Sequence, residues 1–236
     1  MRKGYDPFSL YLFDLIGMGT GGLRGRLEVD DEALLFYAGL LAQHPRSVSA
    51  LEGLLRDYFG VGVQVVQFMG EWLPLSPENR SRLHAGDVNT ALGVSTIAGN
   101  RVWDQQAKFR VRVGPLTYAG FCAFLPSGSA FRPLVELIRF SAGQEYDFDV
   151  QLILKAPEVP RCRLGDVGAS APRLGWSTWL KTAEFADDAE DAIFAPHVTT
   201  LKPQHAEASA EAGGDQDDRE LEVHDWQAEP YLPQRA

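Results

Sequence analysis

The chain has 236 residues and a formal net charge of −10, and 45% of its residues are hydrophobic. This length suits one large domain or two small ones, and the composition supplies enough apolar side chains for a packed core. No apolar run approaches the roughly 18 to 20 residues of a membrane span, and the amino terminus lacks the apolar stretch of a secretory signal. We therefore expect a cytoplasmic protein with no direct membrane insertion.

The acidic residues are concentrated near the end of the sequence. From Glu184 onward there are fourteen acidic residues against three basic ones, whereas the first 183 residues hold eighteen acidic and nineteen basic ones. The stretch "AEASAEAGGDQDD" is small, polar and charged, a composition that cannot bury enough apolar surface to order itself. Residues 183–236 are therefore predicted to form an acidic, disordered tail.

Three helices are predicted in the first part of the chain. The stretch "YDPFSLYLFDLIGMG" starts with Asp6 as a cap and Pro7 in the first helical position. It belongs to an amino-terminal helix and connector at 1–30. The stretch "DDEALLFYAGLLAQ" reads as one helix with acids in its first turn. The third, "SVSALEGLLRDYFG", has apolar residues on one face and ends at Gly60.

Strands follow these helices. The stretch "VGVQVVQFMGEWLPL" is rich in valine and aromatic residues, and "AKFRVRVGPL" alternates apolar with basic side chains, as a half-buried strand does. Gly99 and Asn100 form a good hairpin turn, so Val102 and Trp103 are expected on a return strand that packs on the core. The alternative is that Trp103 and its neighbours Arg101 and Asp104 anchor a subunit interface.

A repeat organises the rest of the chain. Four positions of the third helix recur 83 residues later: Leu51, Leu54, Arg56 and Gly60 match Leu134, Leu137, Arg139 and Gly143. The string R-x-R-L recurs at 80 and 161, and Leu-Gly at 92 and 174. We predict an α+β fold in which the amino-terminal helices precede two pseudo-repeated helix-strand-loop-strand modules, 31–117 and 118–182. Two similar surfaces in one chain can hold two copies of one partner.

The residues do not favour catalysis, a cofactor or a metal site. The histidines stand alone, outside H-E-x-x-H, G-x-S-x-G or Walker patterns. The stretch "GMGTGG" follows a helix and lacks the ending of a phosphate loop, so a helix stop is favoured. Cys122 and Cys162 lie far apart without a CxxC pair, and buried thiols are expected.

Nucleic-acid binding is a further alternative. The stretch "KFRVRV" places three cations on one face of a strand, but the stripe is short and the body has almost no net positive charge. A solvated strand face or an acidic protein partner is preferred, and no nucleic acid is expected.

Several blocks together resemble the TssG family of type VI secretion baseplate proteins, also called ImpH or VasB. The blocks are "DPFSLYLFDLIGM", "LGVSTIAGNRVWDQQAKFRVRVGPL" and "LGWSTWL", and the resemblance covers about residues 5–181. Members of that family normally have a longer region before the first block, and the acidic tail is not a shared feature.

The resemblance implies a structural role and a set of protein partners. TssG proteins join TssF, TssE and TssK in wedges around a central spike hub, and two extensions each dock a TssK trimer that links the wedge to the inner-membrane complex. A non-catalytic adaptor of another contractile, phage-like assembly is the alternative.

Partner contacts are expected in two places. The two long loops of the repeat are predicted to bind TssK, because loops on a rigid scaffold usually carry binding function. The residues predicted for TssK are Trp72, Leu75, Leu83, Val159 and Leu164. The apolar face of the first helix is predicted to bind TssF. The residues predicted for TssF are Phe8, Leu12, Leu15, Ile16 and Trp103.

Overall fold

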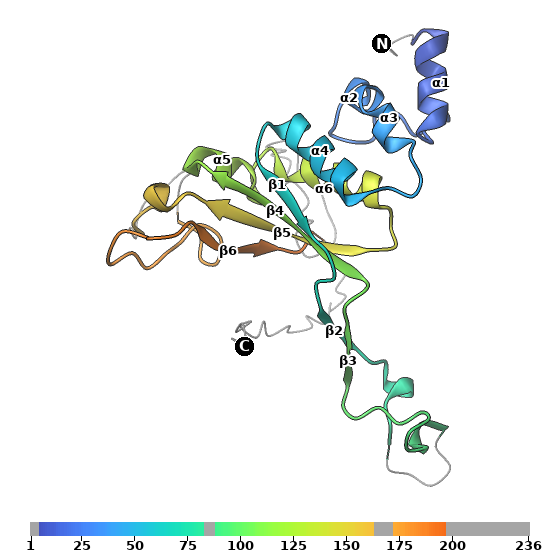
Figure 1. Ribbon diagram of the computed structural model, residues 1–236, viewed down its shortest axis with the longest axis vertical. Coiled ribbons are helices and arrows are strands. Elements are labelled where there is room, and N and C mark those ends of the chain that lie inside the picture. The colour runs from blue at the N-terminus through green and yellow to red at the C-terminus, as the bar shows by residue number, and fades with distance from the viewer. Residues whose placement is uncertain (1–4, 83–87, 163–171, 197–236) are drawn as a thin grey trace, which may run out of the picture. The chain divides into compact units, whose positions relative to one another are not determined.

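The computed structural model describes residues 5–82, 88–162 and 172–196 of the chain (Figure 1). The chain divides into two units, 1–200 and 201–236. The architecture below is that of the first unit, and the predicted tail beyond residue 196 lies outside the described residues.

Three short helices open the chain: α1 (Pro7–Leu15), α2 (Asp31–Phe36) and α3 (Ala38–Leu41). Asp6 occupies the cap position of α1 and Pro7 its first turn, as predicted. The single helix expected over 30–43 is wrong, because Tyr37 leaves helical geometry between α2 and α3, with φ −92° and ψ 11°. There the Tyr37 hydroxyl donates to Asp57 Oδ2 at 2.7 Å, a long-range contact that local helix signals do not reveal.

Helix α4 (Val48–Phe59) has the two ends that its sequence predicts. The Ser47 hydroxyl accepts a hydrogen bond from the Ala50 amide at 3.2 Å, which satisfies one of the free donors of the first turn. At the other end Gly60 has a φ of 64°, and its amide donates to Arg56 O at 3.0 Å.

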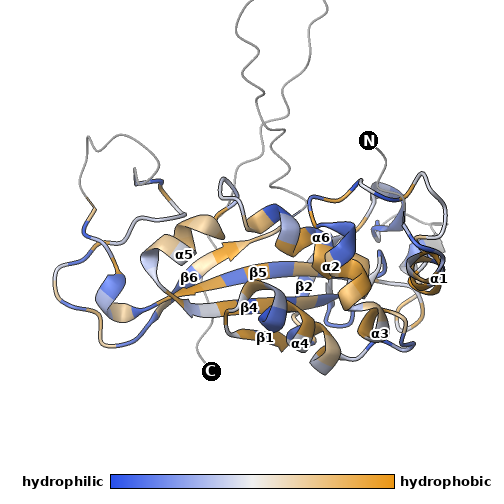
Figure 2. Ribbon diagram, turned by 90° about the horizontal axis from the view of Figure 1, so that it is seen from above, coloured by the Kyte–Doolittle hydropathy of each residue, from blue (hydrophilic) through white to orange (hydrophobic). Residues whose placement is uncertain are grey.

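The main sheet has four strands in the order β1-β4-β5-β6. Their bounds are Val63–Val66 (β1), Lys108–Leu116 (β4), Asp147–Leu154 (β5) and Ala189–Phe194 (β6). The β1–β4 and β5–β6 pairs are antiparallel, whereas β4 runs parallel to β5. Two further helices, α5 (Tyr118–Ala123) and α6 (Phe131–Ala142), lie with α4 over one face (Figure 1). Seen from above, β4 and β5 carry apolar residues beneath these helices (Figure 2).

The core lies between this sheet and its helices. Its central strand residues, Val111 and Val113 of β4 with Val150 and Leu152 of β5, are fully buried. Leu54 of α4 and the other apolar helix residues complete the same cluster.

The first long loop, residues 67–107, leaves the sheet after β1 and carries a separate two-stranded ribbon. Strands β2 (Glu71–Pro74) and β3 (Arg101–Asp104) pair antiparallel, with Trp72 opposite Trp103 (Figure 1). The expected return strand therefore exists, but it pairs with β2. The expectation that Trp103 packs on the core is wrong, since 44% of its surface is exposed. Short 3-10 helices span Pro77–Asn79, Val88–Thr90 and Ala156–Glu158.

The sheet continues into the segment predicted to be tail. Strand β6 pairs with β5, and it buries Ala189, Ala192 and Phe194 while Glu190 and Asp191 face outward. The predicted boundary at 183 is therefore wrong. A count of acidic residues hid this strand, whose burial alternates only over Ala192, Ile193 and Phe194.

The two halves of the sheet share several details. Helices α4 and α6 each have twelve residues, and a glycine with positive φ follows each of them. Arg56 Nη2 donates to Val63 O at 3.0 Å, and Arg139 Nη1 donates to Tyr146 O at 2.7 Å. Leu54 and Leu137 are both buried at matching positions. The division into modules at 31–117 and 118–182 stays a prediction, and the last strand of the second half, β6, lies beyond residue 182.

Candidate protein-binding surfaces

The basic face of β4 is paired with carboxylates from neighbouring strands. Arg110 binds Asp149 of β5 through two hydrogen bonds of 2.7 and 2.9 Å. Lys108 Nζ lies 3.1 Å from Glu71 of β2 and 3.5 Å from the same Asp149, and Arg112 pairs with Glu190 of β6. The expected solvated strand face is therefore wrong, because these cations are half-buried and already engaged. Phosphate binding here would have to break these pairs.

Within the described ranges, no helix is long and apolar enough to cross a membrane. The same ranges contain no group of three or more His, Cys, Asp or Glu side chains that could hold a metal ion. Cys122 is partly buried and Cys162 is exposed. The expectation of two buried thiols is therefore wrong for Cys162.

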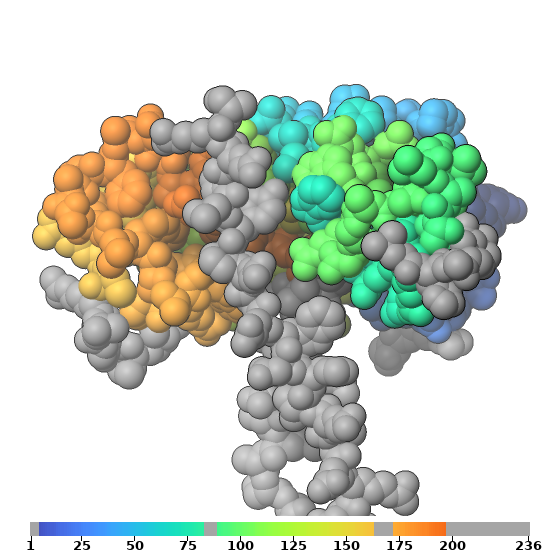
Figure 3. Space-filling model, turned by 90° about the horizontal axis from the view of Figure 1, so that it is seen from below, coloured from blue at the N-terminus to red at the C-terminus, as the bar shows by residue number. Residues whose placement is uncertain are grey.

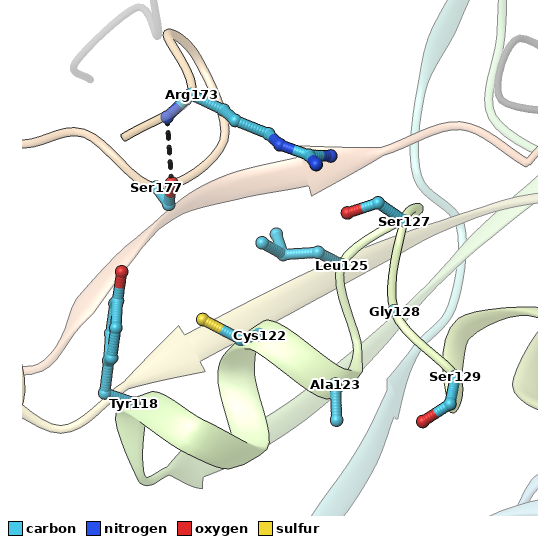
Figure 4. Close-up of a pocket in the computed structure, with 9 residues that line it drawn as sticks. All are labelled: Tyr118, Cys122, Ala123, Leu125, Ser127, Gly128, Ser129, Arg173 and Ser177. Atoms are coloured by element: carbon cyan, nitrogen blue, oxygen red, sulfur yellow. Dashed lines mark hydrogen bonds between the residues drawn. The ribbon is translucent and has the colours of Figure 1, made fainter. Parts of the chain in front are cut away.

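A cavity of about 310 Å³ lies between α5 and the second long loop, residues 155–188 (Figure 4). Tyr118 and Cys122 line it from α5, and Arg173 and Ser177 line it from the loop. Burial raises the pKa of the Tyr118 hydroxyl, and the neighbouring Cys122 raises it further. Among the described residues that line it, there is no histidine or carboxylate that could serve as a general base. We interpret the cavity as a gap where the loop rests on the helix.

The ribbon places two of the predicted binding residues in direct contact. Trp72 and Trp103 were expected to bind different partners, but their rings meet edge-to-face with centroids 5.3 Å apart. Leu75, which follows β2 in the chain, is half-buried, and its amide donates to Asn100 O at 2.8 Å. Leu83 lies outside the described residues. The ribbon thus offers one aromatic surface, where the sequence indicated two separate sites.

The second loop retains little of its predicted site. Val159 is buried, and its carbonyl accepts a hydrogen bond from Lys181 Nζ at 3.0 Å. We therefore withdraw Val159 as a partner contact. Leu164 lies outside the described residues.

Helix α1 exposes much of the apolar face predicted for it. Phe8 is 68% exposed and Leu15 60%, and Leu12 is half-buried. Ile16 is buried in the core and is withdrawn as a contact. Tyr11, which the sequence analysis missed, lies exposed on the same helix.

Two exposed leucines were also missed, one in each long loop. Leu92 is 91% exposed and Leu174 94%, and each precedes a glycine with positive φ. We call residues 91–96 and 173–178 the Leu-Gly turns. The repeated L-G-x-S-T string was the sequence signal that could have pointed to them, but a string does not reveal exposure.

Comparisons with known proteins agree with this architecture. A solved structure described as the type VI secretion system TssK-TssF-TssG baseplate subcomplex matches with a TM-score of 0.66 and 20% identity, over 90% of this chain and 88% of that chain. A structure described as the baseplate complex from the type VI secretion system matches with a TM-score of 0.56 and 17% identity, over 90% of this chain and 59% of that chain. At these identities the likeness shows the fold. The search of curated proteins found no match.

The family comparison extends over most of the sequence. The model described as "Type VI secretion, TssG" matches residues 1–181. This span contains both sheet-forming halves up to the second Leu-Gly turn, and it ends before β6. The chain therefore belongs to the type VI secretion TssG family.

Proposed function

We propose that this chain is a structural subunit of the type VI secretion baseplate wedge that joins TssF and TssE to TssK beside the spike hub. The observation that carries the proposal is the family match over residues 1–181, in a fold whose two halves each send out a long loop. The solved complex with the same fold contains TssK and TssF. In the cell, the subunit is cytoplasmic and is recruited to the inner-membrane secretion complex.

The two loops are the proposed docking sites for two TssK trimers. The matched helices α4 and α6 support this, because equivalent scaffolds hold loops at equivalent points of the sheet. In the first loop, Trp72 and Leu75 remain candidates with accessible surface. Leu83 and Leu164 keep their predicted roles as proposals.

Helix α1 is the proposed contact for TssF. Phe8 and Leu15 expose more than half of their surface, and Leu12 adds to the same helix. Obligate interfaces resemble a divided hydrophobic core, so a partner that covers this helix completes it. Trp103, which lies on the ribbon, is a second proposed TssF contact.

Nucleic-acid binding has less support than protein binding. The three cations that suggested it pair with Asp149, Glu71 and Glu190. An adaptor role in another contractile assembly would use the same surfaces, and it would be distinguished by the partners recovered.

Co-expression with the neighbouring secretion proteins tests the proposal. Affinity purification of this chain should recover TssF and TssK, and native mass spectrometry should give two TssK trimers per chain. A chain with Phe8→Asp and Leu15→Asp should lose TssF. Leu23→Asp, an exposed leucine in the connector, is the matched control and should retain it. Recovery of a stable monomer without either partner would refute the proposal.

A further inference from the structure

The two Leu-Gly turns share two backbone hydrogen bonds, and the first turn has a third, from Thr96 N to Ala91 O at 3.2 Å. In the first, Ala91 O accepts hydrogen bonds from Val94 N at 3.1 Å and Ser95 N at 3.0 Å. In the second, Arg173 O accepts from the amides of the third and fourth residues after it, both at 3.0 Å. The same pair of bonds therefore closes both turns.

Glycine makes this turn possible at the same place in both copies. Gly93 has a φ of 77° and Gly175 a φ of 76°. A Cβ built on either glycine would meet no atom within 4 Å, so backbone conformation and not space requires glycine here. The leucine before each glycine is thus carried on the same backbone.

Of the side chains that the two turns share, only the leucine is exposed in both. Leu92 and Leu174 are almost fully exposed, whereas the residues after the glycines differ. Val94 is exposed, but the ring of Trp176 packs on Phe194 with centroids 5.8 Å apart. A binding site that recognises both turns must therefore recognise the leucine.

We propose that Leu92 and Leu174 are equivalent anchors that insert into the same apolar pocket on two copies of one partner subunit. This inference rests on the proposed function, which supplies TssK as that subunit. It places the main anchor of each loop on the Leu-Gly turn, in addition to the contacts proposed for the R-x-R-L leucines. It also makes the two turns interchangeable.

The arrangement of the loops favours two partner copies. One turn lies in the loop between β1 and β4, and the other in the loop between β5 and β6. Figure 3 shows both regions on one face, with the green ribbon loop to one side and the orange second loop to the other. Burying one leucine side chain is worth about 10- to 100-fold in affinity, so removal of each anchor should weaken one site.

Native mass spectrometry of the full chain, co-purified with TssF and TssK, tests the anchors. Leu92→Asp and Leu174→Asp should each lose one of two TssK trimers, and the double variant should lose both while TssF stays bound. Leu180→Asp is the matched control, because Leu180 is 97% exposed but lies outside the turns. It should keep both trimers, and the thermal midpoint of all variants should match that of the unaltered chain.

Two further variants test the turn itself. Replacing residues 91–96 with the sequence RLGWST of the second turn should preserve both trimers. Gly93→Ala keeps the leucine but strains the positive φ, and it should weaken the first site about fivefold or more.

The outcomes separate the two proposals. Failure of the unaltered chain to bind TssK would reject the proposed function. Two trimers on the unaltered chain and still two on the double variant would reject the anchors alone. Loss of a trimer from Leu180→Asp would also reject them, because any exposed leucine would then suffice.

Discussion

The two long loops start from similar scaffolds but are supported in different ways. The first is held by its own ribbon, whose Trp72 and Trp103 contact each other. The second rests on the core: Trp176 packs on Phe194, and the ring of Trp179 meets that of Phe121 with centroids 5.5 Å apart. The comparison shows that an exposed Leu-Gly turn can be supported either by a separate two-stranded ribbon or by direct packing on the core.

The first loop depends on the junction between its ribbon and the main sheet. A two-stranded ribbon is marginal alone, so its direction depends on contacts at its base. Lys108 links Glu71 of the ribbon to Asp149 of the sheet. Gly70 lies against Trp103, because an added Cβ there would be 1.7 Å from the indole ring.

The largest effect is expected where the second loop meets the core. Phe194 is 6% exposed and contacts Phe131 as well as Trp176. Phe194→Ala should lower the free energy of unfolding by about 3 to 4 kcal/mol, because a buried aromatic ring leaves a cavity. Trp103→Ala on the half-exposed ribbon should cost about 1 kcal/mol or less. Denaturant titration of both variants checks the ranking, and equal losses would contradict it.

An intermediate effect is expected at the base of the ribbon. Lys108→Met should cost about 1 kcal/mol, because Asp149 keeps its two bonds to Arg110. The orientation of the ribbon relative to the main sheet should then vary more. Spin labels at Asn100 and Glu145 should show a broader distance distribution than in the unaltered chain.

Arg132→Met provides the control for that measurement. Arg132 pairs with Glu28 and Glu136 away from the ribbon, so its loss should leave the distribution unchanged. An unchanged distribution in Lys108→Met would show that Lys108 does not orient the ribbon.

A pH-dependent effect is expected at Tyr37, which lies between α2 and α3. Burial, followed by the hydrogen bond to Asp57, raises the pKa of Tyr37 to about 12 from an ordinary 10.0. The neutral hydroxyl is favoured in the folded state, so its contribution is complete below pH 10 and is lost as the pH rises toward 12. Tyr118 has a raised pKa as well, but it neighbours Cys122.

Tyr37→Phe should therefore cost about 1 kcal/mol at neutral pH and remove this part of the alkaline loss of stability. Ultraviolet titration of tyrosinate, with unfolding curves at several pH values, measures both. An unaltered alkaline profile in Tyr37→Phe would contradict the assignment.

Most of the correct predictions came from sequence patterns within a single helix or strand. Ser47 and Gly60 mark the ends of α4, and the 83-residue spacing indicated matching helices before the structure showed their shared hydrogen bonds. These features depend on neighbours in the chain, which a sequence displays directly.

Contacts between distant segments account for the errors. Strand β6 was missed because two adjacent acidic residues interrupt its apolar pattern, and it forms by pairing with β5. The basic face of β4 was read as solvated because its partner Asp149 lies 39 residues beyond Arg110. The exposure of Leu92 and Leu174 could not be predicted either, because the same turn sequence is compatible with burial.

The seam where β4 runs parallel to β5 affects how the protein is made. Each half of the sheet comes from one continuous stretch, so β1 and β4 leave the ribosome before β5 has been synthesised. Until β5 arrives, the edge of β4 beside Val111 and Val113 has unpaired backbone groups that another nascent chain could join. The helices α5 and α6, which are translated between the two strands, therefore set how long the growing polypeptide carries that open edge.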